Sequence, residues 1–358
     1  MKKIGILTGG GDCPGLNAVI RAIVWKSIGN QWVTMGIRDG WKGLIIGDMI
    51  PLTAQEVSGI LTKGGTILGT SRTNPFKDPQ DTEKLLYNIK KFNIDALVAI
   101  GGEDTLGVAL KLHQMGIPVV GVPKTIDNDL SGTDFTFGFD TAVSIVTEAI
   151  DRLRTTAESH HRVMVLEVMG RHAGWIATVS GIAGGAHQIL IPERPFDLDE
   201  VCNTIKARYE KGKTFSIIVV SEGAKFKEHD KVITQDQETD AFGHVKLGGI
   251  GQRLGKEIEK KLGIETRVTV LGHVQRGGTP TAYDRVLATR FGVAAAELLE
   301  NNIYGKMVAL QGNKIVPVDL ANAVTTLKTV DMDFYRIAEI FFEHGQDKQT
   351  MPMPEKTM

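Results

Sequence analysis

The chain of 358 residues is longer than one ordinary hydrophobic core, so we expect two domains with room for a cleft between them. Lys and Arg together number 41 and Asp and Glu 42, and the resulting net charge of −1 excludes a global field that would attract nucleic acid or a membrane surface. The two cysteines, Cys13 and Cys202, are too few and too far apart for a disulfide framework or a zinc motif.

The first residues, Met-Lys-Lys-Ile-Gly-Ile-Leu, lead at once into a glycine-rich loop and lack the apolar stretch of a signal peptide. No later run approaches the roughly 18 consecutive apolar residues of a membrane-spanning helix. We therefore expect a soluble protein of the reducing cytoplasm that contacts neither a membrane nor nucleic acid.

Six short apolar runs along the chain have the length and composition of buried strands. In chain order they cover residues 4–8, 96–100, 117–122, 163–168, 215–220 and 267–270. Apolar residues at helical spacing follow the first three runs, over residues 16–24, around Leu110 and Leu112, and from about 141 to 159. Strands that alternate with helices predict an α/β fold in which parallel sheets are covered on both faces.

The predicted architecture has two doubly wound parallel-sheet lobes with helices on both faces and an active site in the cleft between them. We assign residues 1–138 to the first lobe and 139–300 to the second, into which a polar loop is inserted at about 225–245. Residues 301–343 are expected to pack back on the first lobe, and 344–358 to form a flexible tail. The loops after the six strands would share one sheet edge and could converge on one site.

The segment Pro123-Lys124-Thr125-Ile126-Asp127-Asn128-Asp129 follows the third strand and lies where open α/β sheets bind their ligands. Two carboxylates two residues apart, beside a lysine and a threonine, can hold a divalent cation, accept a proton from a hydroxyl group and neutralise phosphate. This chemistry indicates phosphoryl transfer. The alternative is an Asx-rich turn that closes a strand and has no catalytic role.

Two glycine-rich loops, residues 9–11 and 101–105, suit phosphate because their backbone amides can approach its oxygens at a helix N-terminus. The first lacks the Gly-Lys-Ser or Gly-Lys-Thr of a Walker loop, and a plain tight turn is the alternative. The second carries Glu103 and Asp104 where phosphate would bind, which is typical of a bridging cation. The alternative is that both acids favour the N-terminus of the next helix.

Five arginines and one histidine lie at or next to strand ends and glycine loops. They are Arg72, Arg162, Arg171, Arg267, Arg276 and His273. Guanidinium groups match the geometry of phosphate, so convergence of these residues on one edge would indicate a site for a phosphorylated ligand. Each arginine alone could be a solvated surface charge, and His273 could be a structural histidine.

Five of these segments, in order, resemble the motifs of the 6-phosphofructokinase family, over nearly the whole chain from Lys3 to about Arg290. They read Gly-Gly-Gly-Asp-Cys-Pro-Gly-Leu-Asn at 9–17, Gly-Thr-Ser-Arg-Thr at 69–73, Pro-Lys-Thr-Ile-Asp-Asn-Asp at 123–129, Met-Gly-Arg-His-Ala-Gly-Trp at 169–175 and Leu-Gly-His-Val-Gln-Arg-Gly-Gly at 271–278. The resemblance implies phosphoryl transfer to O1 of fructose 6-phosphate, giving fructose 1,6-bisphosphate. It also implies Mg²⁺ as cofactor and a homodimer or homotetramer with active sites shared between subunits.

The resemblance assigns roles to individual residues. Asp127 would remove the proton of the sugar hydroxyl, with Thr125 and Asp129 beside it and Arg171 steadying the transferred group. The donor phosphates would bind in the first lobe, and Glu103 would meet the metal. The implied donor site is Gly11, Arg72, Gly102, Asp104, Thr105 and Lys124. The implied fructose 6-phosphate site is Thr125, Asp127, Arg162, Met169, Gly170, Arg171, Glu222, Arg267, His273 and Arg276. Arg162 and Arg267 would reach in from a neighbouring subunit.

Two residues depart from the pattern of ATP-using members, which commonly have glycine at the positions of Asp104 and Lys124. A carboxylate about 4 Å from an α-phosphate would cost roughly 4 kcal/mol at an effective dielectric of about 20, or about three decades in binding. Lys124 can instead meet the terminal phosphate of a short donor and pair with Asp104. This combination resembles the pyrophosphate-dependent branch. The alternative is an ATP enzyme in which the two residues form an exposed neutralising pair.

Members of the family with a bacterial effector site bind the effector phosphate through basic residues between subunits. Four of these positions have basic matches here, namely Arg21, Arg154, Lys211 and Lys213. Three others are occupied by Trp25, Ala54 and His187. Because indole and methyl groups remove charge that an anionic effector needs, we do not expect control by nucleotides or phosphoenolpyruvate.

Two further functional classes remain as alternatives. NAD or lipid kinases have a Gly-Gly-Asp-Gly loop that resembles residues 101–105, but that family lacks counterparts of residues 169–175 and 271–278. A non-catalytic sugar-phosphate sensor is the other alternative, and the presence of Asp127 and Arg171 argues against it.

Overall fold

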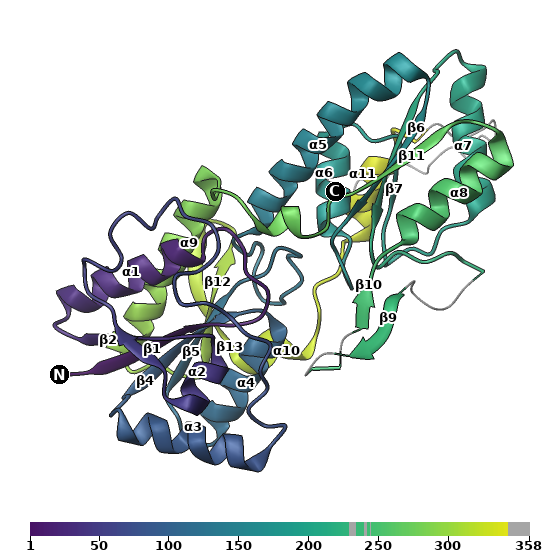
Figure 1. Cartoon of the computed structure of the whole chain (residues 1–358). Coiled ribbons are helices and arrows are strands. Elements are labelled where there is room, and N and C mark those ends of the chain that lie inside the picture. The colour runs from purple at the N-terminus through teal and green to yellow at the C-terminus, as the bar shows by residue number, and fades with distance from the viewer. Residues whose placement is uncertain (229–233, 240–241, 244, 343–358) are drawn as a thin grey trace, which may run out of the picture.

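The computed structural model describes residues 1–228, 234–239, 242–243 and 245–342. It confirms the predicted α/β fold with parallel sheets, and Figure 1 shows its two lobes side by side. Within the described residues, the first lobe contains a seven-stranded sheet in the order β13-β12-β5-β4-β1-β2-β3. The second contains a four-stranded sheet in the order β11-β6-β8-β7.

The first sheet is parallel at its centre and antiparallel at both edges. Its strands are β1 (Lys3–Thr8), β2 (Val33–Ile37), β3 (Met49–Pro51), β4 (Ala96–Gly101), β5 (Val119–Pro123), β12 (Lys306–Gln311) and β13 (Lys314–Asp319). The edge strands β3 and β13 run antiparallel to their neighbours, which the sequence analysis did not predict. Gly312 and Asn313 alone join β12 to β13, and a two-residue turn can make only a hairpin because a parallel connection needs a crossover.

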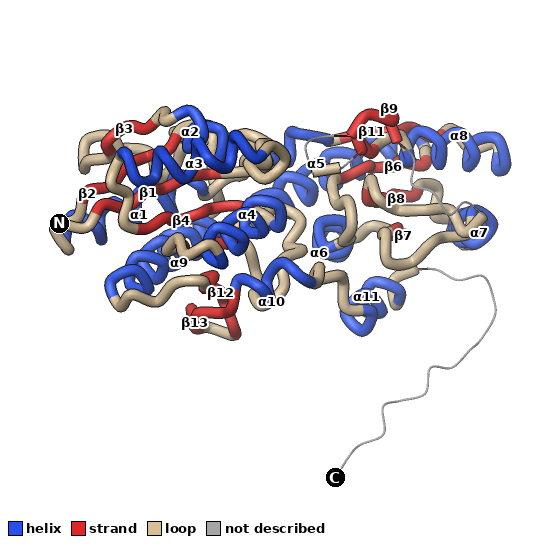
Figure 2. The backbone as a smooth tube through the Cα atoms, turned by 90° about the horizontal axis from the view of Figure 1, so that it is seen from below, coloured by secondary structure: helices blue, strands red, loops and turns tan. Residues whose placement is uncertain are grey.

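Helices cover both faces of the first sheet (Figure 2). Helices α1 (Leu16–Gly29) and α9 (Ala282–Glu300) share one core with Ile4 and Ile6 of β1. Leu7 points to the other core, which includes residues of α2 (Trp41–Ile46), α3 (Pro79–Lys91), α4 (Glu103–Gln114) and α10 (Leu320–Thr325). This alternation follows from the two-residue period of a strand.

Helix α9 is part of the first lobe, although the sequence analysis assigned residues 139–300 to the second. Its apolar face, which includes Leu287 and Phe291, is buried along α1. The ring of Phe291 meets that of Phe137 at a centroid distance of 6.4 Å. The packing partner of an apolar helix face is not encoded in its own periodicity, so the lobe to which α9 belongs emerges only from the structure.

In the second sheet, β6 (Val163–Val168), β7 (Gln188–Leu190), β8 (Ser216–Ser221) and β11 (Thr266–Val270) are all parallel. Helices α5 (Phe139–His160) and α6 (Trp175–Ala183) contribute to the core on one face, and α7 (Leu198–Glu210) and α8 (Ile250–Leu262) to the core on the other. Helix α11 (Met332–Glu339) packs on α6 and β7. No helix of the described chain is long and apolar enough to cross a membrane.

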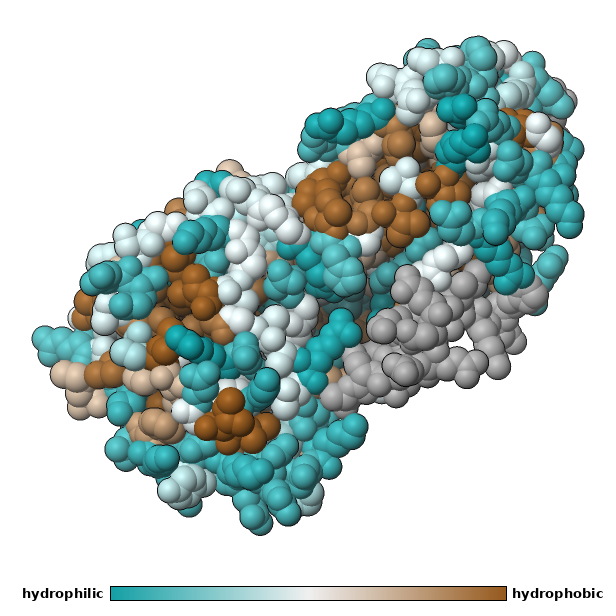
Figure 3. Space-filling model, viewed as in Figure 1, coloured by the Kyte–Doolittle hydropathy of each residue, from teal (hydrophilic) through white to brown (hydrophobic). Residues whose placement is uncertain are grey.

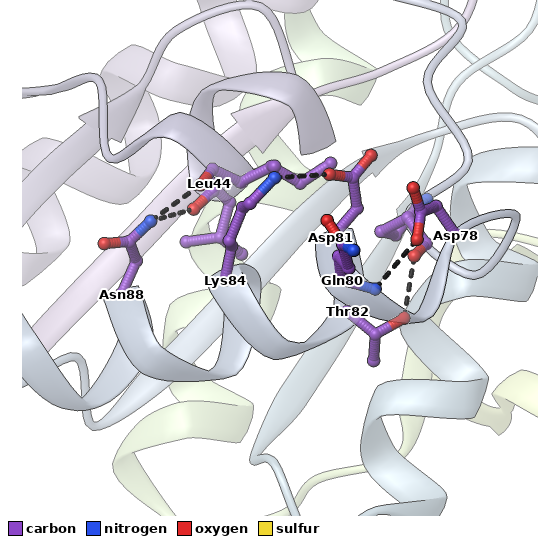
Figure 4. Close-up of polar contacts among 9 residues, drawn as sticks. Leu44, Asp78, Gln80, Asp81, Thr82, Lys84 and Asn88 are labelled. Atoms are coloured by element: carbon purple, nitrogen blue, oxygen red, sulfur yellow. Dashed lines mark hydrogen bonds and ion pairs between the residues drawn. The ribbon is translucent and has the colours of Figure 1, made fainter.

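Local capping explains where α3 begins and how it is held (Figure 4). The carboxylate of Asp78 accepts a hydrogen bond of 2.9 Å from the backbone N–H of Gln80 and so caps the helix. Further along the same helix, buried Asn88 donates to the carbonyl oxygens of Leu44 and Ile45 at 3.0 and 2.8 Å. These bonds satisfy the last carbonyls of α2 and fix α3 against that helix.

Within the described residues the chain passes between the lobes three times: at the start of α5, between β11 and α9, and between α10 and α11. The first two crossings are joined to each other. The carboxylate of Asp284 in α9 accepts hydrogen bonds from the backbone N–H and hydroxyl of Thr141 at 2.8 and 2.5 Å. Conversely, the hydroxyl of Thr281 donates to Asp140 at 2.5 Å, so the N-termini of α5 and α9 clasp each other.

The segment predicted as a polar insertion contains β9 (Thr234–Thr239) and β10 (Val245–Leu247), which pair antiparallel to each other. Residues 229–233, 240–241 and 244 of that segment, and the predicted tail 344–358, lie outside the described residues. The C-terminal segment from residue 301 does not pack on the first lobe alone as predicted, because α10 contacts α4 but α11 contacts the second lobe.

Candidate active site

A cavity of about 170 Å³ lies between the two lobes, and loops from both of them line it. The lining residues are Gly10, Gly11, Arg72, Gly102, Glu103, Asp104, Thr105, Lys124, Thr125, Asp127, Asp129, Met169, Arg171, His172, Glu222, Phe242 and Arg276. The prediction that the six strand-end loops share one sheet edge is wrong. Those after β1, β4 and β5 belong to the first sheet and those after β6, β8 and β11 to the second, so the site forms where two sheets meet.

The two glycine loops of the first lobe meet at the side chain of Thr105. Thr105 is buried, and a Cβ atom on Gly9 would lie 2.5 Å from its hydroxyl oxygen. A Cβ atom on Gly101 would lie 2.5 Å from its methyl carbon. Both positions must therefore be glycine for the loops after β1 and β4 to close around Thr105, which sits at the first turn of α4.

Lys124 is a buried cation beside the first glycine loop. Its side chain is 3% exposed, and Nζ donates a hydrogen bond to the carbonyl oxygen of Gly11. Burial lowers the pKa of Lys124 to about 8, while the neighbouring acids Asp12 and Asp129 act in the opposite direction. Lys124 therefore remains mostly protonated at pH 7. Asp104 lines the same cavity, and its pairing with Lys124 stays a prediction.

A left-handed residue turns the loop after β5 so that two aspartates face the cavity. Asn128 has φ 52°, a conformation that Asn tolerates better than most side chains. Its buried amide accepts a hydrogen bond of 3.1 Å from the N–H of Thr136 and donates one of 3.3 Å to the carbonyl of Asp134. The flanking residues Asp127 and Asp129 both line the cavity.

Asp127 has the most unusual environment of these carboxylates. Its Oδ1 atom is buried and has no hydrogen-bond partner within the described structure. Burial, reinforced by the carboxylates of Asp129 and Glu222, raises the pKa of Asp127 to about 7, against the lowering effect of Arg276 and Arg171. A buried acceptor without a donor is uncommon, and one with a pKa near neutrality is suited to accept a proton from a ligand.

Asp129 is less exceptional. Burial raises its pKa, but a hydrogen bond from Thr125 and the charges of His172 and Lys124 stabilise the ionised form. The hydroxyl oxygen of Thr125 also accepts a hydrogen bond of 3.1 Å from the N–H of Asp127, so Thr125 holds both aspartates in place.

The second lobe supplies Arg171, Met169 and Glu222 to the cavity. Gly223 allows the loops after β6 and β8 to touch, because a Cβ atom there would lie 2.8 Å from the carbonyl carbon of Arg171 and closer still to its oxygen. Burial raises the pKa of Glu222, and the charge of Arg171 and the N–H of Gly170 lower it in part. Arg171 and Glu222 are thus held together opposite the aspartates of the first lobe.

Arg276 crosses from the short 3₁₀ helix η1 (Gly272–Arg276) to the first lobe. Its guanidinium donates to the carbonyl of Asp12 at 3.2 Å, and a Cβ atom on Gly11 would lie 2.7 Å from its Cζ atom. Buried Gln275 accepts a hydrogen bond of 3.2 Å from the N–H of Met169 and fixes the base of this loop. Arg276, which the resemblance gave to the sugar phosphate, therefore lies against the predicted donor loop.

Four residues of the predicted fructose 6-phosphate site do not line this cavity: Arg162, Gly170, Arg267 and His273. The guanidiniums of Arg162 and Arg267 both pair with the carboxylate of Glu265, the former at 2.8 Å. These three paired residues lie towards the amino ends of β6 and β11, roughly 17–23 Å along the strands from cavity-lining Met169 at about 3.3 Å per residue. His273 is exposed on η1.

Two of the positions that resemble an effector site, His187 and Arg154, are engaged by contacts within the protein. The ring of His187 packs edge-on against Phe215 at 5.5 Å and accepts a hydrogen bond of 2.8 Å from the N–H of Ile217. Burial, together with the charges of Arg208 and Arg154, lowers the pKa of His187 to about 3, so the ring is neutral at physiological pH. The guanidinium of Arg154 itself donates to the carbonyl oxygens of Gly184 and Gly185.

The donor set fits a metal that is bound mainly through substrate. In the described part of the chain, no three His, Cys, Asp or Glu side chains are grouped to hold an ion by themselves. Mg²⁺ commonly uses only one or two carboxylates and completes its coordination with phosphate oxygens and water. Glu103 and Asp104 stand at the first turn of α4 and line the cavity, so they could supply that small number of protein ligands.

Sequence reasoning missed several residues of the site. Gly10 and His172 line the cavity and stand inside motifs quoted above, so their position was available as a signal. Phe242 also lines it, and Lys328 donates its backbone N–H to the carbonyl of Asp129 at 2.8 Å. These last two residues lie in segments where no motif points to the site.

Comparison with known proteins matches residues 3–299 to the Phosphofructokinase family. A protein of Amycolatopsis methanolica named pyrophosphate–fructose 6-phosphate 1-phosphotransferase is 59% identical over 95% of this chain and 99% of its own length. A Streptomyces coelicolor protein named ATP-dependent 6-phosphofructokinase 3 is 52% identical over 94% of this chain and 99% of its length. The crystal structure of Pichia pastoris phosphofructokinase in the T-state superposes with a TM-score of 0.80 at 33% identity, covering 95% of this chain, which spans 36% of that longer chain.

Proposed function

Because the chain belongs to the phosphofructokinase family, we propose that it transfers a phosphoryl group from pyrophosphate to O1 of fructose 6-phosphate, in the cytoplasm. The products are fructose 1,6-bisphosphate and phosphate. Similarity to a relative named as pyrophosphate-dependent supports the donor, but relatives named as ATP-dependent are nearly as similar. The choice of donor therefore depends on the site itself.

The observation that carries the proposed chemistry is the unpartnered buried oxygen of Asp127. A fructose O1 hydroxyl that donates to Oδ1 would satisfy this atom and be oriented for attack on the donor. Asp127 then accepts the hydroxyl proton as O1 bonds to phosphorus and the bond from phosphorus to the bridging oxygen of pyrophosphate breaks. Its pKa near 7 leaves a large fraction ionised at neutral pH.

Arg171, from the opposite side of the cavity, offsets the negative charge of the transferred group in the transition state. Met169 and Glu222 belong with it in binding fructose 6-phosphate, Met169 through its apolar contact area and Glu222 by accepting hydrogen bonds from sugar hydroxyls. Asp129 and Thr125 hold Asp127 in place, since Thr125 contacts both aspartates.

The charged side chains of the first lobe favour a short donor. Lys124 is a buried cation beside Gly10 and Gly11, where a terminal phosphate would approach the backbone amides. Arg72, Gly102 and Thr105 complete the donor site, and Asp104 disfavours an α-phosphate at that place.

Glu103 would hold Mg²⁺ at the donor end of the cavity. Such a cation neutralises phosphate charge and orients the donor when it is bound. Glu103 would thus anchor a positive charge on the phosphates at the first turn of α4.

We further propose that the active protein is a homo-oligomer in which a neighbouring copy supplies Arg162, Arg267 and His273. Arg162 and Arg267 lie roughly 23 and 17 Å from their own chain's cavity along the strands, too far to bind its sugar phosphate. Strand β11 is an edge strand, and Val270 and Val274 near it are 48% and 65% exposed. Figure 3 has hydrophobic residues gathered on this face of the second lobe, which is typical of a subunit interface.

A coupled assay that offers each donor in turn tests the proposal. Fructose 1,6-bisphosphate formation is followed with pyrophosphate or ATP at equal concentration, with Mg²⁺ present and then chelated. We expect turnover with pyrophosphate and at least about a hundredfold lower kcat/KM with ATP, within the three decades estimated from the charge of Asp104. A higher kcat/KM with ATP than with pyrophosphate would show that ATP is the donor. Absence of turnover with either donor would contradict the proposed reaction.

A further inference from the structure

A short segment outside the matched family region joins the two sides of the cavity. Residues 326–330, here called the inter-lobe strap, follow α10 on the first lobe and precede α11 on the second. The family match ends at residue 299, so no motif assigns a role to the strap. It makes the third of the three chain crossings between the lobes, and it contacts the loop that carries Asp127 and Asp129.

On the first-lobe side, the strap pairs with the chain just after Asp127. The backbone N–H of Lys328 donates to the carbonyl of Asp129 at 2.8 Å, and Leu327 forms an antiparallel bridge with Leu130. The hydroxyl of Ser131 donates to the carbonyl of Thr326 at 2.6 Å. The backbone of the strap therefore pairs with the aspartate loop in the manner of a short antiparallel strand.

The side chain of Lys328 fastens the far end of the same loop. Its Nζ atom donates to the carbonyl oxygens of Thr133 and Asp134 at 3.0 and 2.7 Å. It also lies 5.3 Å from the ring centroid of Trp175, within the range of a cation–π contact. One ammonium group thus closes the loop from Asp129 to Asp134 and touches the second lobe.

On the second-lobe side, the strap holds the segment that carries Arg171. The indole N–H of Trp175 donates to the carbonyl of Lys328 at 3.1 Å. The carboxylate of Glu193 accepts hydrogen bonds from the N–H of Val330 at 2.9 Å and from the N–H of Gly174 at 3.0 Å. Gly174 is the N-cap of α6 and follows Arg171 by three residues.

We propose that Lys328 is a positioning residue for phosphoryl transfer: it sets the separation between Asp127 in the first lobe and Arg171 in the second. This inference rests on the proposed function. Lys328 does not line the cavity, so it acts through the loops rather than on substrate. Each substrate binds mainly within one lobe, whereas the transition state spans both. Loss of the Lys328 contacts should therefore lower kcat more than it raises either KM.

The principal test compares Lys328→Met with Lys328→Arg. Methionine keeps the chain length and apolar contact with Trp175 but removes the charge and both side-chain hydrogen bonds, whereas arginine can restore them. We expect Lys328→Met to lower kcat about 10- to 100-fold with KM for each substrate changed less than about threefold, and Lys328→Arg to recover most of the loss. Lys314→Met, at an exposed lysine of β13, is the matched control and should be unchanged.

Trp175→Phe provides a second variant, because it retains an aromatic ring but removes the indole N–H that donates to the carbonyl of Lys328, together with part of the ring's contact area. It should lower kcat about three- to tenfold, and the double variant with Lys328→Met should lose less than the product of the two single effects. Each variant is measured as the full chain, with its melting temperature recorded alongside.

Several outcomes would overturn the inference while leaving the proposed function intact. They are an active wild type with Lys328→Met within twofold in kcat, a Lys328→Met defect that appears mainly in KM, or a Lys328→Arg variant that folds but recovers nothing. An inactive wild type would instead contradict the proposed function, so the two failures are distinguishable.

Discussion

The ammonium group of Lys124 donates a hydrogen bond to the carbonyl oxygen of Gly11, a residue 113 positions earlier in the chain. This bond joins the loops after β5 and β1 at the donor end of the cavity. It also fixes the position of the positive charge next to Gly10. The Nζ atom lies 3.5 Å from the place that a Cβ atom of Gly10 would occupy. The buried cation that we expect to favour a free terminal phosphate is therefore held by a contact between two loops of the first lobe.

Donor preference should reverse when the two departures from the ATP pattern are removed together. Asp104→Gly takes away a negative charge next to an α-phosphate, and Lys124→Gly takes away the cation that favours a free terminal phosphate. The double variant should gain ATP use by up to about three decades, less where solvent screens the site, and lose pyrophosphate use. Initial rates with each donor measure this preference. An unchanged ratio of the rates with ATP and pyrophosphate in both single variants and the double variant would contradict the proposed roles of Asp104 and Lys124. The single effects should be non-additive if the residues touch.

The pH dependence of kcat/KM for pyrophosphate should be bell-shaped. Asp127 must be ionised, and since its pKa is raised to about 7, activity should fall as pH drops below that value. Lys124 must be protonated, and since its pKa is lowered to about 8, activity should fall as pH rises above it. Lys124→Met should abolish the alkaline limb and keep the acid limb. A wild-type profile that is flat from pH 6 to 9 would contradict both assignments.

Asp127→Asn should preserve shape and remove basicity. We expect kcat to fall by about two to four decades with a smaller effect on KM, because the proton acceptor acts mainly in the transition state. Steady-state kinetics with saturating pyrophosphate and Mg²⁺ measure this. Asp151→Asn, at an exposed position on α5, controls for the substitution itself. A variant that keeps most of its kcat would refute the role of Asp127.

Gly223→Ala should damage the second-lobe half of the site. The added methyl group would meet the backbone carbonyl of Arg171, which cannot rotate away as a side chain could. A shift of about 1 Å in Arg171 should cost about 100-fold in kcat. Gly107→Ala is the matched control, since a Cβ atom there meets nothing within 4 Å and a helix interior favours alanine over glycine. Equal activity of the two variants would argue that Arg171 is not held by this contact.

Hybrid oligomers test whether active sites are shared. An Asp127→Asn subunit and an Arg267→Ala subunit should each be inactive as pure oligomers. After dissociation and random reassociation, half of the dimers would be hybrids, each with one intact site of two, so about a quarter of wild-type activity should return. Mixing two batches of Asp127→Asn is the control and should restore nothing. Full activity of a monomer at assay concentration would contradict the shared site.

Local pattern was enough to predict many elements of the fold and one half of the site. The predicted strand at 163–168 coincides with β6, and the helix predicted at about 141–159 is α5 from Phe139 to His160. Lys124 and Asp127 were expected at the carboxyl end of a buried strand, and both line the cavity. These predictions succeeded because strand length, helical periodicity and the edge rule for parallel sheets depend only on neighbouring residues.

What sequence reasoning missed depends on contacts between distant segments. Arg276 reaches Asp12 across 264 positions, and nothing in the sequence around either residue indicates that contact. The lobe to which α9 belongs and the contact of Lys328 with Asp129 are of the same kind. Such contacts follow from how two sheets are placed against each other, which no local period encodes.

The three crossings between the lobes restrict how this molecule can be divided or moved. Each lobe is assembled from separate stretches of chain, so no single cut would release a fragment that contains one complete sheet with all the helices that cover it. A domain joined to its neighbour by one linker can swing freely, whereas three connections with two of them clasped by Asp284 and Thr281 resist wide opening. Relative motion of the two lobes should therefore be a small rotation or slide. Substrates should enter and leave the cavity without a wide opening of the two lobes.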